Sequence, residues 1–271
     1  MILRYVFKRI LLMLLFIAGG NFLQAQILMQ FIPIASGQSM LSELSYIQNS
    51  ALFTNLDSSV LAVGYIPSRF GLTELATSEL LFGRRLTNEL VIATHISGLG
   101  NELYSEISGT LHASFKTTDA LTFGGAVQLS RISFKNERAD FAVQFHAGTL
   151  LQLSDKLTAG ASLQNFTRAY YAGGEQTVQQ QANFSIGIEA LDNLFFDAGA
   201  KILLNKSSGI SLAASYKRFK NFHFSLAALS NPRSAEFSFA IPNIYNFTIS
   251  GTAHYHDLLG FSERISIAYY F

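Results

Sequence analysis

The sequence of 271 residues contains no cysteine, only four prolines and few charged side chains. Without cysteine there is no disulfide bond, no thiolate metal site, no cysteine nucleophile and no lipid attached through a cysteine. Charged residues make up 14% of the chain, against about 25% in soluble proteins. The net charge of +1, with no basic stripe, argues against nucleic acid as a partner.

Long apolar runs are also lacking. The chain is 49% hydrophobic, yet beyond its N-terminal stretch no apolar run approaches the roughly 20 residues that a transmembrane helix needs. At the start, Arg4, Lys8 and Arg9 precede a short apolar stretch, and Ala25 is a small residue at a plausible cleavage point. We therefore predict a secretory signal peptide over residues 1–25, with an uncleaved anchor as the alternative.

What the chain does contain is apolar residues that alternate with a period of two. Phe123 and Val127 point to one face of a predicted strand, while Thr122, Gln128 and Ser130 point to the other. Alternation of this kind is typical of strands with one face toward lipid and one toward a polar lumen. The predicted strands run about 9 to 14 residues, as a tilted membrane crossing requires, against about 5 or 6 in soluble sheets.

About fourteen such strands follow from residue 58 onward, an even number as in bacterial single-chain barrels. Tight turns and longer links are expected to alternate between them. Thr87-Asn88 and Asn243 are predicted as tight turns, and Asn231–Ala235 as a longer link. The sequence thus predicts an all-β fold, an antiparallel transmembrane β-barrel over residues 58–271.

The last strand ends the chain on aromatic residues. Tyr269 and Phe271 stand at the C-terminus of an alternating segment, and bacterial outer-membrane barrels close on a strand of this kind. We expect these two residues to form the signal read by the barrel-assembly machinery. The predicted location is therefore the outer membrane of a Gram-negative bacterium, in contact with its lipids.

The segment between the signal and the barrel, residues 26–57, does not alternate. Its first part, Ile27–Ile34, is apolar, and no tight turn pairs the segment with the first strand. We predict that it forms a plug or hatch inside the lumen or beneath it. The alternative is a disordered periplasmic tail, which the apolar content disfavours.

Two short motifs resemble a known family. The stretch Tyr46–Leu52, followed by strands, resembles the Asn-Pro-Ala stretch near the N-terminus of FadL-like outer-membrane barrels, with Ser50 where the family usually has proline. The stretch Gly160–Phe166 resembles a recurring strand of the same group. The layout matches over most of the chain and is most similar to PorV/PorQ-type proteins of Bacteroidota.

The resemblance implies two functions. PorV/PorQ-type members are non-enzymatic accessory or scaffold proteins of type IX secretion, so the main expectation is contact with secretion-system proteins. The alternative is FadL-like passive transport of small hydrophobic molecules, with Ile27–Ile34 and Asn49 in the gate.

The faces predicted to line the lumen contain polar side chains of both charge signs. A ring of one sign would indicate an ion-selective pore, whereas mixed signs indicate either a self-paired polar filling or a polar permeation path. The candidate lumen or gate residues are Asn49, Glu106, His112, Gln128, Gln144, His146, Asp197, Lys201, His254 and Arg264.

One pair of residues suggests a remote enzymatic alternative. His95 and Ser97 share a strand face, so the imidazole is able to activate the hydroxyl, as in outer-membrane lipid hydrolases. Such a nucleophile also needs an orienting third group and an oxyanion donor. His254 and His256 also share a face, but a metal site needs further ligands. The sequence assigns no catalytic residue, cofactor or metal site.

Overall fold

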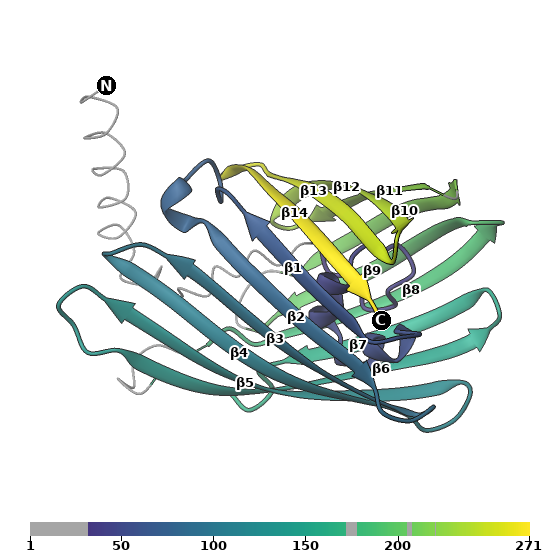
Figure 1. The fold of residues 1–271 in the computed structure, drawn as a ribbon, viewed down its shortest axis with the longest axis horizontal. Coiled ribbons are helices and arrows are strands. Elements are labelled where there is room, and N and C mark those ends of the chain that lie inside the picture. The colour runs from purple at the N-terminus through teal and green to yellow at the C-terminus, as the bar shows by residue number, and fades with distance from the viewer. Residues whose placement is uncertain (1–31, 172–177, 205–207, 220) are drawn as a thin grey trace.

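The computed structural model describes residues 32–171, 178–204, 208–219 and 221–271, and the predicted signal peptide at 1–25 lies outside them. Fourteen antiparallel strands form a closed barrel (Figure 1), in which every strand pairs with its neighbours in sequence and β1 pairs with β14. The predicted all-β class, antiparallel barrel and strand number are confirmed.

The strands follow one another around the barrel in chain order and are 7 to 15 residues long. They are β1 Val60–Ile66, β2 Thr77–Arg85, β3 Leu90–Gly100, β4 Tyr104–Lys116, β5 Leu121–Phe134, β6 Asp140–Ser154, β7 Leu157–Gln164, β8 Gln181–Leu191, β9 Leu194–Leu203, β10 Gly209–Phe219, β11 Phe222–Ser230, β12 Arg233–Ile244, β13 Phe247–His256 and β14 Gly260–Tyr270. Three short 3-10 helices are η1 Glu43–Gln48, η2 Ser50–Asn55 and η3 Thr73–Leu75.

Burial alternates along the strands as the sequence pattern predicts. In β8, Phe184 and Ile186 are 47% and 54% exposed on the outside, while Asn183 and Ser185 are buried on the inside. The exterior is therefore apolar and the interior polar, the arrangement of barrels that face lipid. Within the described part of the chain, no helix has both the length and the apolar character to span a membrane.

Two predicted connections are wrong. The tight turn expected at Asn243 lies instead at Tyr245 and Asn246, which both adopt positive φ angles of 51° and 69°, as a two-residue hairpin turn of type I′ requires. The longer link expected at Asn231–Ala235 is only two residues long, since β12 already begins at Arg233. In both places strand pairing continues further than the local turn-forming residues suggest, because each added pair extends the backbone ladder.

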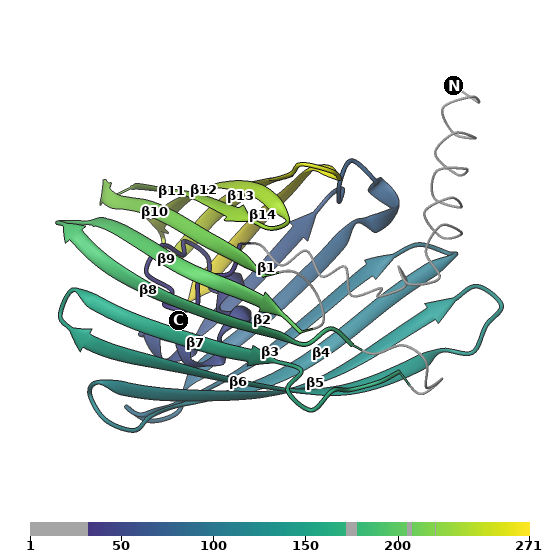
Figure 2. The same cartoon turned by 180° about the vertical axis from the view of Figure 1, so that it is seen from behind.

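The described part of the N-terminal segment, residues 32–57, lies within the barrel and is called the inner segment below. In Figures 1 and 2 its dark purple helices are surrounded by the strands. Leu44 and Phe53 are fully buried and pack in one cluster with Val60 of β1 and Leu81 of β2. One side of the inner segment therefore completes an apolar core against β1–β3.

Glycines let the inner segment approach the opposite part of the wall. Gly124 of β5 and Gly148 of β6 are paired in register. A Cβ atom at Gly124 would overlap the backbone nitrogen of Ala51, and one at Gly148 would overlap the side-chain oxygen of Asn49. The start of η2 consequently lies directly on the backbone of these two strands.

Candidate functional site

Hydrogen bonds connect the inner segment to distant strands. The Nζ of Lys217 in β10 donates to the backbone oxygen of Gln38 at 2.7 Å. The backbone N–H of Ser36 donates to Oγ of Ser185 in β8 at 2.6 Å, and the hydroxyl of Ser36 donates to the carboxylate of Asp197 in β9. These contacts hold the first part of the inner segment against β8–β10.

Asn49, predicted to lie in the gate, joins the two helices to the wall. Its Oδ1 accepts from the backbone N–H of Ala51 at 3.1 Å and so caps η2. Its Nδ2 donates to the backbone oxygens of Ala35 at 2.7 Å and of Thr149 in β6 at 3.2 Å. Asn49 is therefore a structural joint of the inner segment in this conformation.

Two of the predicted lumen histidines, on β4 and β6 with β5 between them, support different segments. Nδ1 of His112 in β4 lies 3.0 Å from Oγ of Ser50, and its ring centroid lies 4.8 Å from that of Phe53. Nδ1 of His146 in β6 accepts from the backbone N–H of Asn165 at 3.2 Å. His112 thus supports η2, while His146 supports the connection after β7.

Several other predicted lumen residues pair with the barrel itself. Gln128 and Gln144 both donate to Oγ of Ser130, at 2.9 and 3.1 Å. Glu106 accepts from the hydroxyl of Tyr104 at 3.2 Å. Lys201 is buried in β9, on the lumen side of the wall. These contacts correspond to the self-paired filling among the two interpretations of the lumen.

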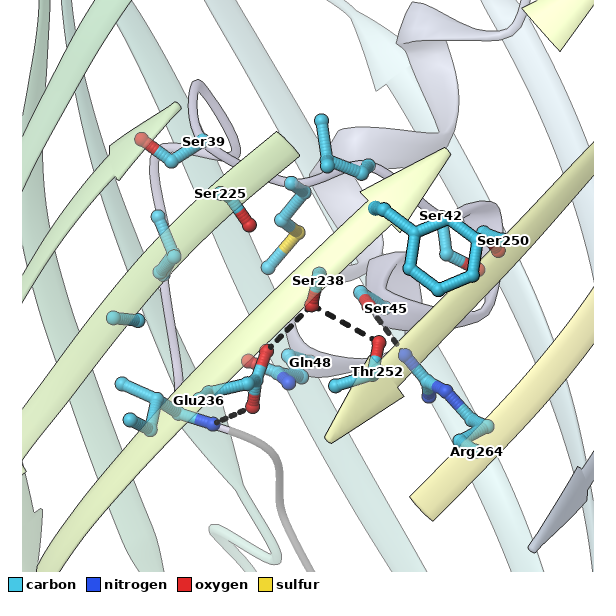
Figure 3. Close-up of a pocket in the computed structure, with 16 residues that line it drawn as sticks. Ser39, Ser42, Ser45, Gln48, Ser225, Glu236, Ser238, Ser250, Thr252 and Arg264 are labelled. Carbon is cyan, nitrogen blue, oxygen red and sulfur yellow. Dashed lines mark hydrogen bonds between the residues drawn. The ribbon is translucent and has the colours of Figure 1, made fainter. Parts of the chain in front are cut away.

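A small cavity remains between the inner segment and β11–β14 (Figure 3). It offers about 20 Å³ to water-sized spheres, which is room for about one water molecule and too little for an organic compound. Its polar residues on the barrel side are Ser225, Glu236, Ser238, Ser250, Thr252 and Arg264.

The two charged residues of this cavity are held by hydrogen bonds. Glu236 accepts from the backbone N–H of Ile32 at 3.1 Å, and Nδ1 of His254 lies 3.6 Å from the same carboxylate. Arg264 donates to Oγ of Ser45 at 3.2 Å and lies 3.9 Å from the carboxylate of Glu79. Both charges therefore anchor the inner segment or pair with the wall.

The opposite side of the cavity belongs to the inner segment, and its polar residues are spaced by three. Ser39, Ser42, Ser45 and Gln48 line the cavity. Residues three apart share a face of a 3-10 helix, so Ser45 and Gln48 both lie on the cavity face of η1. Sequence reasoning missed this stripe, although its spacing is visible in the sequence.

Sequence reasoning also missed Glu43 as a candidate lumen residue. It lies in η1, and the hydroxyl of Tyr270 in β14 donates to its carboxylate. Burial raises the pKa of Glu43 above its usual value, and the hydrogen bond from Tyr270 opposes this only in part. The carboxyl is therefore less acidic in the barrel than in water.

Among the described residues, no hydrogen bond joins His95 to Ser97 as the remote hydrolase alternative would require. His95 and Ser97 share the lumen side of β3 as predicted, but the hydroxyl of Ser97 pairs with that of Ser108 at 2.8 Å. Nε2 of His95 is buried without a hydrogen-bond partner in the described chain. Across the described ranges, no three histidine or acidic residues are grouped so that they would hold a metal ion.

The C-terminal aromatic residues lie where the barrel closes. The backbone N–H of Phe271 donates to the oxygen of Ser59 at 3.0 Å, and its ring stacks on Phe82 at 6.4 Å. The ring of Tyr269 lies 4.8 Å from that of Phe247. The assembly role of Tyr269 and Phe271 stays a prediction.

No family model and no curated protein matches the sequence. Solved structures do match the fold. A FadL homologue of Pseudomonas aeruginosa has a TM-score of 0.59 at 11% identity, over 88% of this chain and 96% of the other. The toluene transporter TodX of Pseudomonas putida has a TM-score of 0.62 at 9% identity, over 88% and 95%. A mutant of TodX, named a monoaromatic hydrocarbon channel, reaches 0.71 at 9% identity, over 90% and 100%.

These likenesses concern the fold. They support the FadL-like part of the predicted resemblance, and they lend no support to the closer relationship with PorV/PorQ-type proteins.

Proposed function

We propose that this protein is a passive channel of the Gram-negative outer membrane, admitting small organic compounds past the inner segment. The apolar exterior and polar interior of the barrel support a place in lipid. TodX, which has a similar fold, is named a toluene transporter, and this likeness supports the proposal of transport. The partners are then outer-membrane lipids, the solute and, during assembly, the barrel-assembly machinery.

The observation on which the proposal rests is the position of the inner segment inside a closed wall. It contacts β1–β3 with apolar residues and β8–β10 through hydrogen bonds. Toward β11–β14 it borders the small cavity, beside which Ile32 donates to Glu236 and Arg264 donates to Ser45. Displacement of the inner segment away from β11–β14 would break these few hydrogen bonds and widen the cavity into a passage, while the strand pairing of the barrel stays intact.

An engineered disulfide tests whether this displacement opens the channel. The hydroxyls of Ser42 in the inner segment and Ser266 in β14 lie 3.4 Å apart. Because the chain has no cysteine, Ser42→Cys with Ser266→Cys would form a single cross-link beside the cavity. We expect the oxidised form to lose uptake of labelled toluene and benzyl alcohol in a porin-deficient host, and a reductant to restore it.

A matched cross-link within the wall is the control. The hydroxyls of Ser97 and Ser108 lie 2.8 Å apart on β3 and β4, so Ser97→Cys with Ser108→Cys cross-links two strands and leaves the inner segment free. Uptake by this control should not respond to oxidation. If the Ser42–Ser266 cross-link forms fully and uptake is unchanged, or if neither compound enters through the unmodified protein, the proposed function is wrong.

A further inference from the structure

The residues around the cavity restrict the solute of the proposed channel. We infer that the channel favours small uncharged molecules with a hydroxyl group on an apolar body, such as aromatic alcohols, over hydrocarbons. This inference rests on the proposed function and concerns the passage between the inner segment and β11–β14. Figure 3 shows the hydroxyl groups that surround this space.

Both sides of the cavity present hydroxyl groups. Ser42 and Ser45 line it from the inner segment, and Ser225, Ser238 and Thr252 line it from β11–β13. The hydroxyls of Ser238 and Thr252 bond to each other at 3.0 Å. A solute that separates the two sides therefore passes between groups that donate and accept hydrogen bonds.

One of these hydroxyls, that of Ser225, has no hydrogen-bond partner among the described residues. Ser225 is 7% exposed, and its hydroxyl makes no hydrogen bond with the rest of the described chain. In Figure 3 it lies at the cavity with no dashed line. The hydroxyl faces the cavity, so a solute hydroxyl at this position would take the hydrogen bond that a water molecule otherwise makes.

The charges of the cavity do not favour an ionic solute. The carboxylate of Glu236 accepts hydrogen bonds from the backbone N–H of Ile32 and from the hydroxyl of Ser238. The guanidinium of Arg264 donates a hydrogen bond to Oγ of Ser45 and lies beside the carboxylate of Glu79. A charged solute would have to compete with these contacts, whereas a neutral hydroxyl needs only the hydroxyls of the lining.

The lining also has an apolar part. Ile34, Met40 and Leu41 of the inner segment border the same space. A sugar would place its own polar groups against this apolar surface. A hydrocarbon would leave the hydroxyls of the lining without hydrogen-bond partners. A molecule with both an apolar body and a hydroxyl satisfies both parts of the lining.

Toluene and benzyl alcohol, which differ by one hydroxyl, provide the test. Initial uptake of each labelled compound is measured in a porin-deficient host that makes the full-length protein, relative to the same host without it. We expect the protein to raise the uptake of benzyl alcohol more than that of toluene. Ser225→Ala combined with Thr252→Val should lower the benzyl alcohol to toluene ratio by about fivefold, as for the loss of one neutral hydrogen bond.

The matched control changes the same residue types on another part of the lumen wall. Ser108→Ala with Thr110→Val alters β4, whose residues do not line the cavity, and should leave the ratio unchanged. Heat-modifiable migration confirms that each variant is folded. Equal or greater stimulation of toluene uptake overturns the inference but leaves the channel in place. If neither compound enters, the proposed function fails and this inference with it.

Discussion

At the scale of single residues, the glycines beneath η2 allow the inner segment to pack directly on the barrel wall, and a substitution tests this role. Gly124 meets the backbone of Ala51 so closely that an added Cβ atom would overlap it. We expect Gly124→Ala to push the inner segment away from β5, at a cost of about 1–3 kcal/mol in docking free energy. Faster proteolysis within the inner segment would report this displacement, and basal uptake should fall because the segment moves toward β11–β14, while the barrel remains folded.

Gly109 of β4 provides the matched control, because nothing lies within 4 Å of a Cβ atom built there. Gly109→Ala should leave both proteolysis and uptake unchanged. Equal effects of the two substitutions would mean that the close approach at Gly124 does not hold the inner segment.

The roles of individual polar residues were only partly predictable from the sequence. Parity along a strand placed His112, Gln128 and His146 on the lumen side, because successive side chains of a strand alternate between faces. Parity does not reveal partners, however. That His112 meets Ser50, and that His146 accepts from Asn165, depends on where the inner segment and the connection after β7 lie.

At the scale of elements, the docking of η1 should depend on pH. Since burial raises the pKa of Glu43, the docked segment binds a proton more tightly than the displaced one. Docking is therefore most favourable below the pKa of an exposed glutamate, about 4.3, and weakens as the pH rises through the raised value. Proteolysis of the inner segment in the folded barrel should accelerate with rising pH.

Glu43→Gln removes the titrating group and should make this acceleration much smaller. Glu137→Gln, in the exposed connection between β5 and β6, should retain it. A pH dependence that is identical in the wild type and in the Glu43→Gln variant would assign the effect to another group.

The strands were more predictable than the connections between them. Period-two alternation identified the crossing strands, because lipid and lumen act on opposite faces of every strand. Turn residues such as Asn243 indicate only a local preference. The pairing of Ile244 with Phe247 extends the ladder past this preference and moves the turn to Tyr245 and Asn246.

At the scale of the whole molecule, assembly should depend on the C-terminal aromatic residue. We expect Phe271→Ser to lower the amount of heat-modifiable barrel in outer membranes, because the last strand loses its predicted recognition residue and its ring contact with Phe82. Phe166→Ser removes a similarly exposed ring in the connection after β7 and should assemble normally. Equal barrel levels in both variants would rule out a special role for Phe271.

The barrel, its number of strands and its polar interior could all be predicted from the amino-acid pattern. These follow from alternation, which is a property of neighbouring residues and needs no knowledge of distant ones. Only the folded barrel shows which partners the lumen residues have and which residues border the cavity. Ser45 and Ser225 border one cavity although 180 residues separate them in sequence, and only closure of the barrel around the inner segment brings such residues together.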